Sequence, residues 1–350
     1  LFSPVIASDG TVELVAGVSR NITERQQAAD ALRASQTSLA LALQAGKAGT
    51  FEWDIQNDIN RWSPELEALY DVPPGTFEGN YEAWASRVEA EDEHTVSIGL
   101  QAALRAQQRD YAYEFRAILP DGRRRWLSGR ARFDYAADGA PLRMLGINID
   151  IHDRKQAELN AQFLLDLDSQ VNRLAEAADI EQAAVDSLGA YLNVARTFFG
   201  HIDGDRVTVT HEWARDEPSL LGVYQLGEYF SPEALQQLRD NVAIVADDII
   251  TDARTSDALA RHHALGIRAF VSIPVVYHEQ CIGALNIVSA EPRAWSGSDV
   301  RLLREVVARI WPLLEQAHSR AALRESKARL QILYTQEQTA RTQAEEASRL

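Results

Sequence analysis

The stretch Tyr113–Phe133, YEFRAILPDGRRRWLSGRARF, decides the fold of this chain. Two runs that alternate apolar and polar residues flank the turn Pro120-Asp121-Gly122, and alternation with a period of two is typical of half-buried strands. A third such run follows a second turn at Asp138-Gly139. Turns this short join neighbouring antiparallel strands. We therefore predict three consecutive antiparallel strands, at Tyr111–Leu119, Arg124–Tyr135 and Leu142–Asp150.

Upstream of these strands, the sequence predicts a shorter hairpin followed by helices. The strands Thr50–Ile55 and Ile59–Trp62 are separated by a polar turn. Ser63-Pro64 then starts a helix, because Ser caps free N–H groups and Pro is tolerated at the first helical position. Short helical patterns follow at Tyr81–Val88 and Asp92–Gln107. The order is two strands, several helices, three strands and an exit helix.

This order and four strings resemble a PAS domain of bacterial sensor proteins. The strings are GTFEWDI, RWSPELEALYDVPPG, YEFRAILPDGRRRWLSGRARF and GINIDIHDRKQAE, in chain order. The resemblance spans residues 44–158 and implies one antiparallel sheet with helices on its face and a pocket between them. The last string is similar to the conserved ending of the family, in which Asp150 and Arg154 are implied to transmit the signal into the exit helix.

A repeat indicates an earlier copy of the same unit. DGTVELVAGVSRNITERQQA, starting at Asp9, aligns without a gap with DGAPLRMLGINIDIHDRKQA, starting at Asp138, and Gly17 matches Gly146. Residues 1–28 therefore resemble the C-terminal end of a first PAS domain, with Asn21-Ile22-Thr23-Glu24-Arg25 as its ending. Residues 29–43 are predicted to form a linker helix.

The following segment predicts a second α+β unit. Helices at Gln156–Glu176 and Ile180–Leu192 precede several strands, and a hairpin joins Arg268–Tyr277 to Cys281–Ser289. A closing helix is expected at Ser298–Glu315, with a kink at Pro312. The stretches VADDIITDAR and LGIRAFVSIPVVYHEQCIGALNIVSAEPRAWSGSDVRLLREVVARI resemble a GAF domain. This resemblance assigns residues 159–318 to a GAF domain, whose architecture is close to that of PAS.

Composition excludes several classes of protein. A net charge of −16 argues against a general nucleic-acid binder, which needs an excess of Lys and Arg. The single cysteine, Cys281, forms no internal disulfide, so the chain suits the reducing cytoplasm. No apolar run reaches the ~20 residues of a membrane helix, and no signal peptide is expected. The chain starts at Leu1 rather than Met, so we interpret the chain as a fragment.

The residues predict no catalytic or metal site. There is no phosphate-binding loop and no nucleophile elbow. His262-His263 are adjacent on a helix and point ~100° apart, so we expect an exposed helix face rather than a metal site. The acidic residues Asp247, Asp248 and Asp252 are expected in a solvated turn. Cys281 lies in an apolar strand pattern, where a free Cys behaves as a small hydrophobe.

The candidate pocket residues are aromatic. Trp53 and Trp62 could stack on a ligand in the PAS unit, and the GAF unit offers a pocket near Trp213, Tyr224, Phe270 and Tyr277; in both cases core packing is the alternative role. The sequence does not identify a cofactor. We expect no covalent flavin, since residues 44–158 hold no Cys, and no bilin linkage, since the segment RHHAL lacks the Cys that bilin attachment needs. Haem is not expected either, because His94 lies in a solvated acidic helix start. Non-covalent flavin stays open.

The C-terminal segment, residues 319–350, predicts a coiled coil. Apolar residues recur at heptad a and d positions, including Leu323 and Leu330, with polar Ser326 and Glu337 in the same seam. The first linker repeats the pattern with Leu32, Ser35 and Leu39. We therefore expect a parallel homodimer through these helices; a single solvated helix is the alternative.

Together these features predict an α+β chain: tandem PAS-like and GAF-like domains, joined by long signalling helices and ending in a coiled coil. TARTQAEEASRL, starting at Thr339, resembles the lead-in to the phosphoacceptor helix of sensor histidine kinases. The resemblance implies the cytoplasmic input region of such a kinase, with the kinase core outside this chain and a response regulator as the partner in the phosphorelay. The alternatives are the input region of a cyclic-dinucleotide enzyme or transcription regulator, and a stand-alone ligand- or chromophore-binding module.

Overall fold

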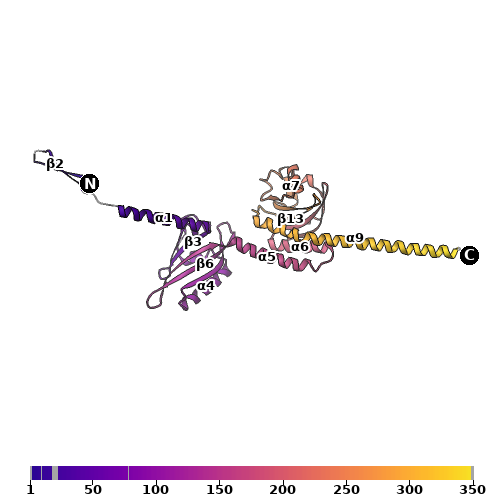
Figure 1. Cartoon of the computed structure of the whole chain (residues 1–350), viewed down its shortest axis with the longest axis horizontal. Helices are drawn as coiled ribbons and strands as arrows, with labels where there is room; N and C mark the ends of the chain where they lie inside the picture. The colour runs from indigo at the N-terminus through magenta and orange to yellow at the C-terminus, as the bar shows by residue number, and fades with distance from the viewer. Residues whose placement is uncertain (1, 9, 18–22, 78, 348–350) are drawn as a thin grey trace. The chain divides into compact units, whose positions relative to one another are not determined.

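The computed structural model describes the chain except for residues 1, 9, 18–22, 78 and 348–350. The chain divides into two compact units, residues 1–155 and 156–350, and the division falls inside helix α5, His152–Val171. The first unit opens with a hairpin of β1 (Phe2–Ile6) and β2 (Val12–Gly17), followed by helix α1 (Thr23–Ala45) (Figure 1). Asn21 and Ile22 of the predicted first PAS ending lie outside the described residues.

The main sheet of the first unit has five antiparallel strands in the order β4-β3-β7-β6-β5. The three long strands predicted from the sequence are confirmed, and Tyr113 pairs with Gly129 across the hairpin. The first and last strands of the unit are neighbours, because β3 pairs with β7. The strands are β3 (Ala48–Asp54), β4 (Ile59–Trp62), β5 (Asp110–Ile118), β6 (Arg124–Tyr135) and β7 (Pro141–Asp150).

Helices α2 (Pro64–Leu69), α3 (Tyr81–Ala85) and α4 (Ala90–Arg105) join β4 to β5. Ser63 caps α2 as predicted, since its Oγ accepts a hydrogen bond from the Leu66 backbone N–H at 3.3 Å. These helices bury apolar side chains against one face of the sheet, and the core includes Leu66, Tyr70, Trp84, Phe115 and Leu127. This core holds the helices of the first unit on its sheet.

The second unit is built on six antiparallel strands in the order β10-β9-β8-β13-β12-β11. Five of these strands were predicted from the sequence. The sixth, β10, was not predicted, because its four residues show no strong alternation of apolar and polar side chains. The strands are β8 (Arg196–Asp203), β9 (Arg206–Ala214), β10 (Gly222–Gln225), β11 (Ile244–Ala246), β12 (Ala269–Tyr277) and β13 (Gln280–Ser289).

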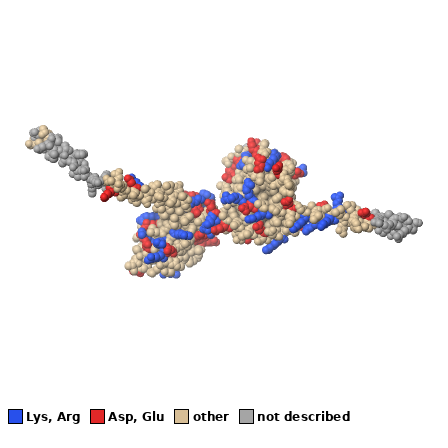
Figure 2. Space-filling model, viewed as in Figure 1, with Lys and Arg blue, Asp and Glu red and all other residues tan. Residues whose placement is uncertain are grey.

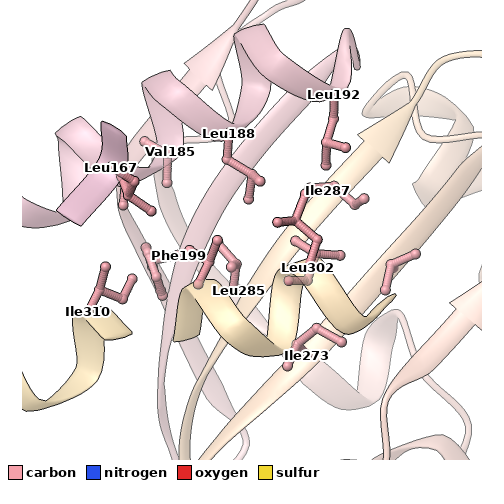
Figure 3. Close-up of a cluster of buried hydrophobic side chains, with 14 of the residues drawn as sticks. Leu167, Val185, Leu188, Leu192, Phe199, Ile273, Leu285, Ile287, Leu302 and Ile310 are labelled. Carbon is pink, nitrogen blue, oxygen red and sulfur yellow. The ribbon is translucent and has the colours of Figure 1, made fainter. Parts of the chain in front are cut away.

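One face of this sheet packs against helices to form the main core of the unit. Helix α6 (Ala177–Leu192) supplies Val185 and Leu188, and α9 (Gly297–Ala347) supplies Leu302 and Ile310. Figure 3 shows these side chains meeting Phe199, Ile273, Leu285 and Ile287 of the sheet. The C-terminal half of α5 joins the same core through Leu167. Helices from both ends of the unit are therefore anchored in one core.

The opposite face of the sheet is covered by α7 (Pro232–Arg239), the short 3-10 turns Leu226–Glu228 and Ser256–Ala258, and α8 (Leu259–Ala264). Ser231 caps α7 through the Ala234 N–H at 3.3 Å. Phe270, Ala284 and Val288 point to this face, because side chains alternate along a strand. The sheet thus separates a helical core from a second layer that holds a cavity.

Helix α9 differs from the prediction of two separate C-terminal helices. It runs unbroken from Gly297 to Ala347, and Pro312 lies inside it without ending it. The predicted boundary at residue 319 is thus a change of environment: Leu314 and Ala317 are buried, whereas Leu323 and Leu330 are more than half exposed. One helix carries both the last core layer and the predicted coiled-coil seam.

Charges of both signs are interspersed over the visible face of each unit (Figure 2). Many are paired, as in Arg116 with Asp92 at 2.7 Å and Arg268 with Asp248 at 2.7 Å. No helix in the described part of the chain is long and apolar enough to cross a bilayer.

Candidate functional site

The second unit contains a cavity of about 90 Å³ between the sheet and the α7–α8 layer. Its wall is mostly aromatic and aliphatic, with contributions from Phe198, Tyr224, Tyr229, Phe230, Phe270 and Ala284. Three polar side chains interrupt this surface: His262 on the helical side, and Ser272 and Asn286 on the sheet. The last two face each other across β12 and β13. Apolar walls with a few polar groups are typical of ligand pockets.

His262 overturns one expectation from the sequence. The prediction of an exposed helix face is wrong for this residue, which is only 2% exposed, whereas the neighbouring His263 is exposed as predicted. The imidazole stacks on Phe270, with ring centroids 5.9 Å apart and planes 5° apart. Its Nδ1 lies 3.2 Å from the Ala258 carbonyl oxygen. Burial lowers the pKa of His262, so the ring is held neutral at physiological pH.

Two of the four aromatic residues predicted for this pocket line it, and two do not. Tyr224 and Phe270 belong to the wall. Trp213 lies on the other face of the sheet, because a β-bulge between Phe199 and Gly200 inverts the alternation of β9. Its ring packs there against Gly189 of α6.

Tyr277 also lies outside the cavity. It is seven residues from Phe270 on the same strand, an odd number, so the two side chains point to opposite faces. Its hydroxyl donates to Glu315 of α9 at 2.8 Å. Tyr277 therefore contacts helix α9 rather than the pocket.

The first unit has a smaller cavity, of about 30 Å³, between its sheet and helices. Trp53 and Trp62 both line it. Each ring also has a structural contact: Trp53 Nε1 donates to Asp58 at 2.9 Å, and Trp62 stacks on Phe77 with centroids 3.6 Å apart. The side-chain oxygens of Asn60 and Asn148 in the same wall are buried without a hydrogen-bond partner among the described residues.

The exit from the first unit is a network of ion pairs around its last strand. Asp150 accepts a hydrogen bond from the His152 backbone N–H at 2.8 Å, which caps the start of α5. Arg154, on the first turn of α5, donates to Glu114 of β5 at 2.7 Å, and Lys155 reaches the other carboxylate oxygen at 2.6 Å. These hydrogen bonds lower the pKa of Glu114. Arg154 and Lys155 thus tie the first turn of α5 to strand β5 by charge, whereas Asp150 caps the start of the helix.

The exit helix of the second unit carries the other predicted transmission residues. Leu323, Ser326, Leu330 and Glu337 all lie on α9 and are exposed in the single chain. The spacing of three and four residues places them along one side of the helix. Leu333, at the next d position, is 54% exposed. This stripe lies beyond the last core residue of the domain.

The acidic and thiol candidates have ordinary structural roles. Asp248 pairs with Arg268 at 2.7 Å, and Asp252 pairs with Arg254. Asp247 accepts from the Trp295 N–H at 2.9 Å. Cys281 lies half-buried on β13, and burial raises the pKa of its thiol. Within residues 2–8, 10–17, 23–77 and 79–347 there is no cluster of three metal-ligating side chains with suitable geometry.

The sequence did not predict the buried carboxylate of Glu181. Glu181 of α6 is 2% exposed, and its Oε2 lies 3.0 Å from His201 Nε2 and 3.0 Å from His211 Nδ1. The hydrogen bond to Glu181 raises the pKa of His201. The bulge in β9 brings His211 to this face, so no periodicity in the sequence could have indicated the cluster.

Comparisons with known proteins match this architecture. Residues 59–148 match the family described as PAS fold, and residues 176–312 match the GAF domain family. The probable diguanylate cyclase DgcE of Escherichia coli (strain K12) is 28% identical over 151 residues, which cover 43% of this chain and 13% of that protein. The chain therefore spans about an eighth of the length of this relative.

Parts of the chain are also similar to solved structures. A sensory box histidine kinase/response regulator from Burkholderia thailandensis E264 is 24% identical, with a TM-score of 0.31 over 34% of this chain and 88% of that chain. A phycocyanobilin-bound GAF domain from a cyanobacterial phytochrome is 19% identical, with a TM-score of 0.42 over 46% of this chain and 96% of that chain. The family matches and the two sheets agree: this chain carries a PAS domain and a GAF domain in tandem.

Proposed function

We propose that this chain is the cytoplasmic signal-sensing and signal-transmitting region of a two-component sensor histidine kinase. The observation that carries the proposal is helix α9. Its first half is part of the GAF core through Leu302 and Ile310, and its second half extends beyond the domain as a stripe of exposed leucines. A change in the packing of the domain would move or rotate a helix that leaves it.

The transmitter is proposed to act as a parallel homodimer. Leu323 and Leu330 are 55% and 63% exposed, and Leu32 and Leu39 on α1 are 60% and 59% exposed. Apolar residues at heptad spacing on a solvent-exposed helix are buried when a second helix packs on them. Pairing of two copies would place the same residues of each helix in register.

The kinase as output rests on the resemblance of TARTQAEEASRL to the segment that precedes a phosphoacceptor helix. A second candidate, the input region of a cyclic-dinucleotide enzyme, is favoured by the 28% identity to a probable diguanylate cyclase. In both cases the PAS and GAF domains would supply the signal and α9 would deliver it.

The coding sequence after the Leu350 codon tests the choice of output. A phosphoacceptor histidine segment followed by an ATP-binding domain is expected, and the purified full protein should then incorporate phosphate from ATP on histidine. A cyclic-dinucleotide synthase domain in that position would overturn the kinase and support the second candidate. A DNA-binding domain would contradict both.

A further inference from the structure

The GAF cavity differs from a general-purpose pocket in the charge of its wall. Among the residues that the structure describes, no Lys, Arg, Asp or Glu lines it. A charged ligand would leave water without a compensating partner, and such a transfer is strongly unfavourable. The wall therefore selects neutral molecules and disfavours carboxylates, phosphates and nucleotides.

His262 is the polar side chain on the helical side of the cavity, whereas Ser272 and Asn286 lie on the sheet. The Ala258 carbonyl oxygen can only accept a hydrogen bond, so the nitrogen that faces it at 3.2 Å, Nδ1, carries the proton. In the neutral ring Nε2 is then an acceptor. No hydrogen-bond partner for Nε2 lies in the described part of the chain, although the residue is 2% exposed. Because buried polar groups are normally hydrogen-bonded, this acceptor in an apolar wall requires a hydrogen-bond donor on the ligand.

The ring is also held in one orientation. It stacks on Phe270 and meets Tyr229 and Phe230 edge-on, with centroids 5.6 Å and 6.1 Å away. These three neighbours and the Nδ1 hydrogen bond fix the direction of Nε2. A fixed acceptor costs little entropy when a ligand binds, which favours selectivity.

A route from solvent to the cavity is visible in its wall. Ile202, Leu226 and Leu238 line the cavity and also line a wide surface depression beside the β12–β13 turn. The three aliphatic side chains are thus the partition between the depression and the cavity. Leu226 and Leu238 are buried, so movement of these side chains is what entry from the depression would require.

We propose that the GAF cavity binds a small, neutral, mainly apolar molecule that carries one hydroxyl or N–H group, and that this group donates a hydrogen bond to His262 Nε2. The proposal deepens the proposed function, since it names the class of ligand that the sensory region takes. At about 90 Å³ the space is smaller than the roughly 150 Å³ cavity that binds benzene, so a ring with one small substituent fits only when the wall moves outward, and nothing larger is expected to bind.

Three probes of similar shape test the class: phenol, toluene and benzoate, titrated into the full 350-residue chain by calorimetry and by NMR. We expect phenol to bind at least tenfold more tightly than benzoate. His262→Phe keeps the ring stacking but removes the acceptor, and should weaken phenol about tenfold, since an unpaired buried hydroxyl costs about 1–3 kcal/mol. Toluene affinity should be unchanged or higher in this variant.

A second variant keeps the test valid if His262→Phe fails to fold. Ala284→Leu fills the cavity from the sheet and should abolish binding of both phenol and toluene, while the thermal unfolding of each variant shows that the domain is folded. An unchanged phenol-to-toluene ratio in His262→Phe, preferential binding of benzoate, or no binding of phenol to the wild type would each overturn the proposal. None of these outcomes alters the identity of the output domain, which is the test of the proposed function.

Discussion

Gly49 lies where strand β3 passes closest to helix α2. A Cβ atom at this position would fall 2.3 Å from both the backbone nitrogen and the Cα of Leu66. Leu66 is fully buried, and backbone atoms cannot rotate away as a side chain would. The approach of helix α2 to strand β3 therefore depends on the absence of a side chain at Gly49.

We expect Gly49→Ala to destabilise the PAS domain by about 2 kcal/mol or more, in the range of overpacked cores. Gly297→Ala is the matched control: at the start of α9 an added Cβ meets only the far end of the Arg301 side chain, at 3.4 Å. Urea unfolding followed by tryptophan fluorescence measures both. Equal midpoints for the two variants would contradict this account of the packing.

The Glu181 cluster predicts a pH dependence of the GAF domain. The hydrogen bond to Glu181 raises the pKa of His201 above 6.5 in the folded state. A raised pKa means that the stabilisation is complete below the unfolded-state pKa and is lost as pH rises through the folded-state value. The His201 side chain is 42% exposed, so the effect is expected to stay below about 1 kcal/mol.

Glu181→Gln removes the negative charge and should flatten the decrease in the free energy of unfolding as the pH rises above 6.5. Glu305→Gln, at an exposed position on α9 far from these histidines in sequence, is the control and should keep the wild-type slope. Denaturation midpoints across this pH range provide the measurement. A wild-type slope in Glu181→Gln would show that the cluster has no part in the pH dependence.

The positions of single side chains were the hardest feature to predict from the sequence. Phe270 was found because aromatic residues in a strand are good pocket candidates, and parity along the same strand would have excluded Tyr277. Trp213 could not have been excluded, since a bulge in β9 changes its face and leaves no trace in the pattern. His262 was misplaced because a histidine in a six-residue helix gives too little periodicity to assign a buried face.

Helices and strands were predicted more accurately from the sequence than the positions of single side chains. The long strands of the PAS sheet are strongly alternating, and Arg124–Tyr135 was predicted with its observed bounds. The capped helices after Ser63 and Ser231 also followed from local chemistry. The short strand β10 did not follow, because it depends on pairing with its neighbour β9. The continuity of α9 through Pro312 did not follow either, because local chemistry predicts a break or kink at a proline.

Helix α9 leads to a prediction about its seam. Glu337 occupies an a position of the proposed coiled coil, where a carboxylate weakens pairing. Glu337→Leu should tighten the dimer at least tenfold, measured by sedimentation equilibrium. In the full protein it should also fix the output in one state whatever the signal, since a weak seam leaves more than one arrangement accessible.

Thr335→Leu is the matched control, because it adds the same side chain at an outward f position of α9. It should leave the dimer affinity within about threefold of the wild type. A wild-type chain that remains monomeric at tens of micromolar, or equal effects of the two substitutions, would contradict the predicted seam.

In the proposed function, a signal passes along α5, which joins the two units, and then along α9, which leaves the core of the second unit. Helix α5 begins against the PAS strand β7 and ends in the GAF core, and α9 begins in that core and continues beyond it. In this arrangement the rotational phase of α9 matters more than its length. A heptad insertion keeps the phase of a coiled coil, whereas four added residues shift it.

We therefore expect a duplication of Leu323–Arg329, seven residues beyond the GAF core, to preserve the response of the full protein to its signal. Duplication of only Leu323–Ser326 adds four residues and should lock the output or invert it, because the downstream seam turns relative to the core of the domain. Both variants keep the PAS and GAF domains intact, so their unfolding midpoints should match the wild type. Output activity is measured with and without the signal for each. Equal responses from the two insertions would show that the helix acts as a tether, and transmission by rotation or register would then be excluded.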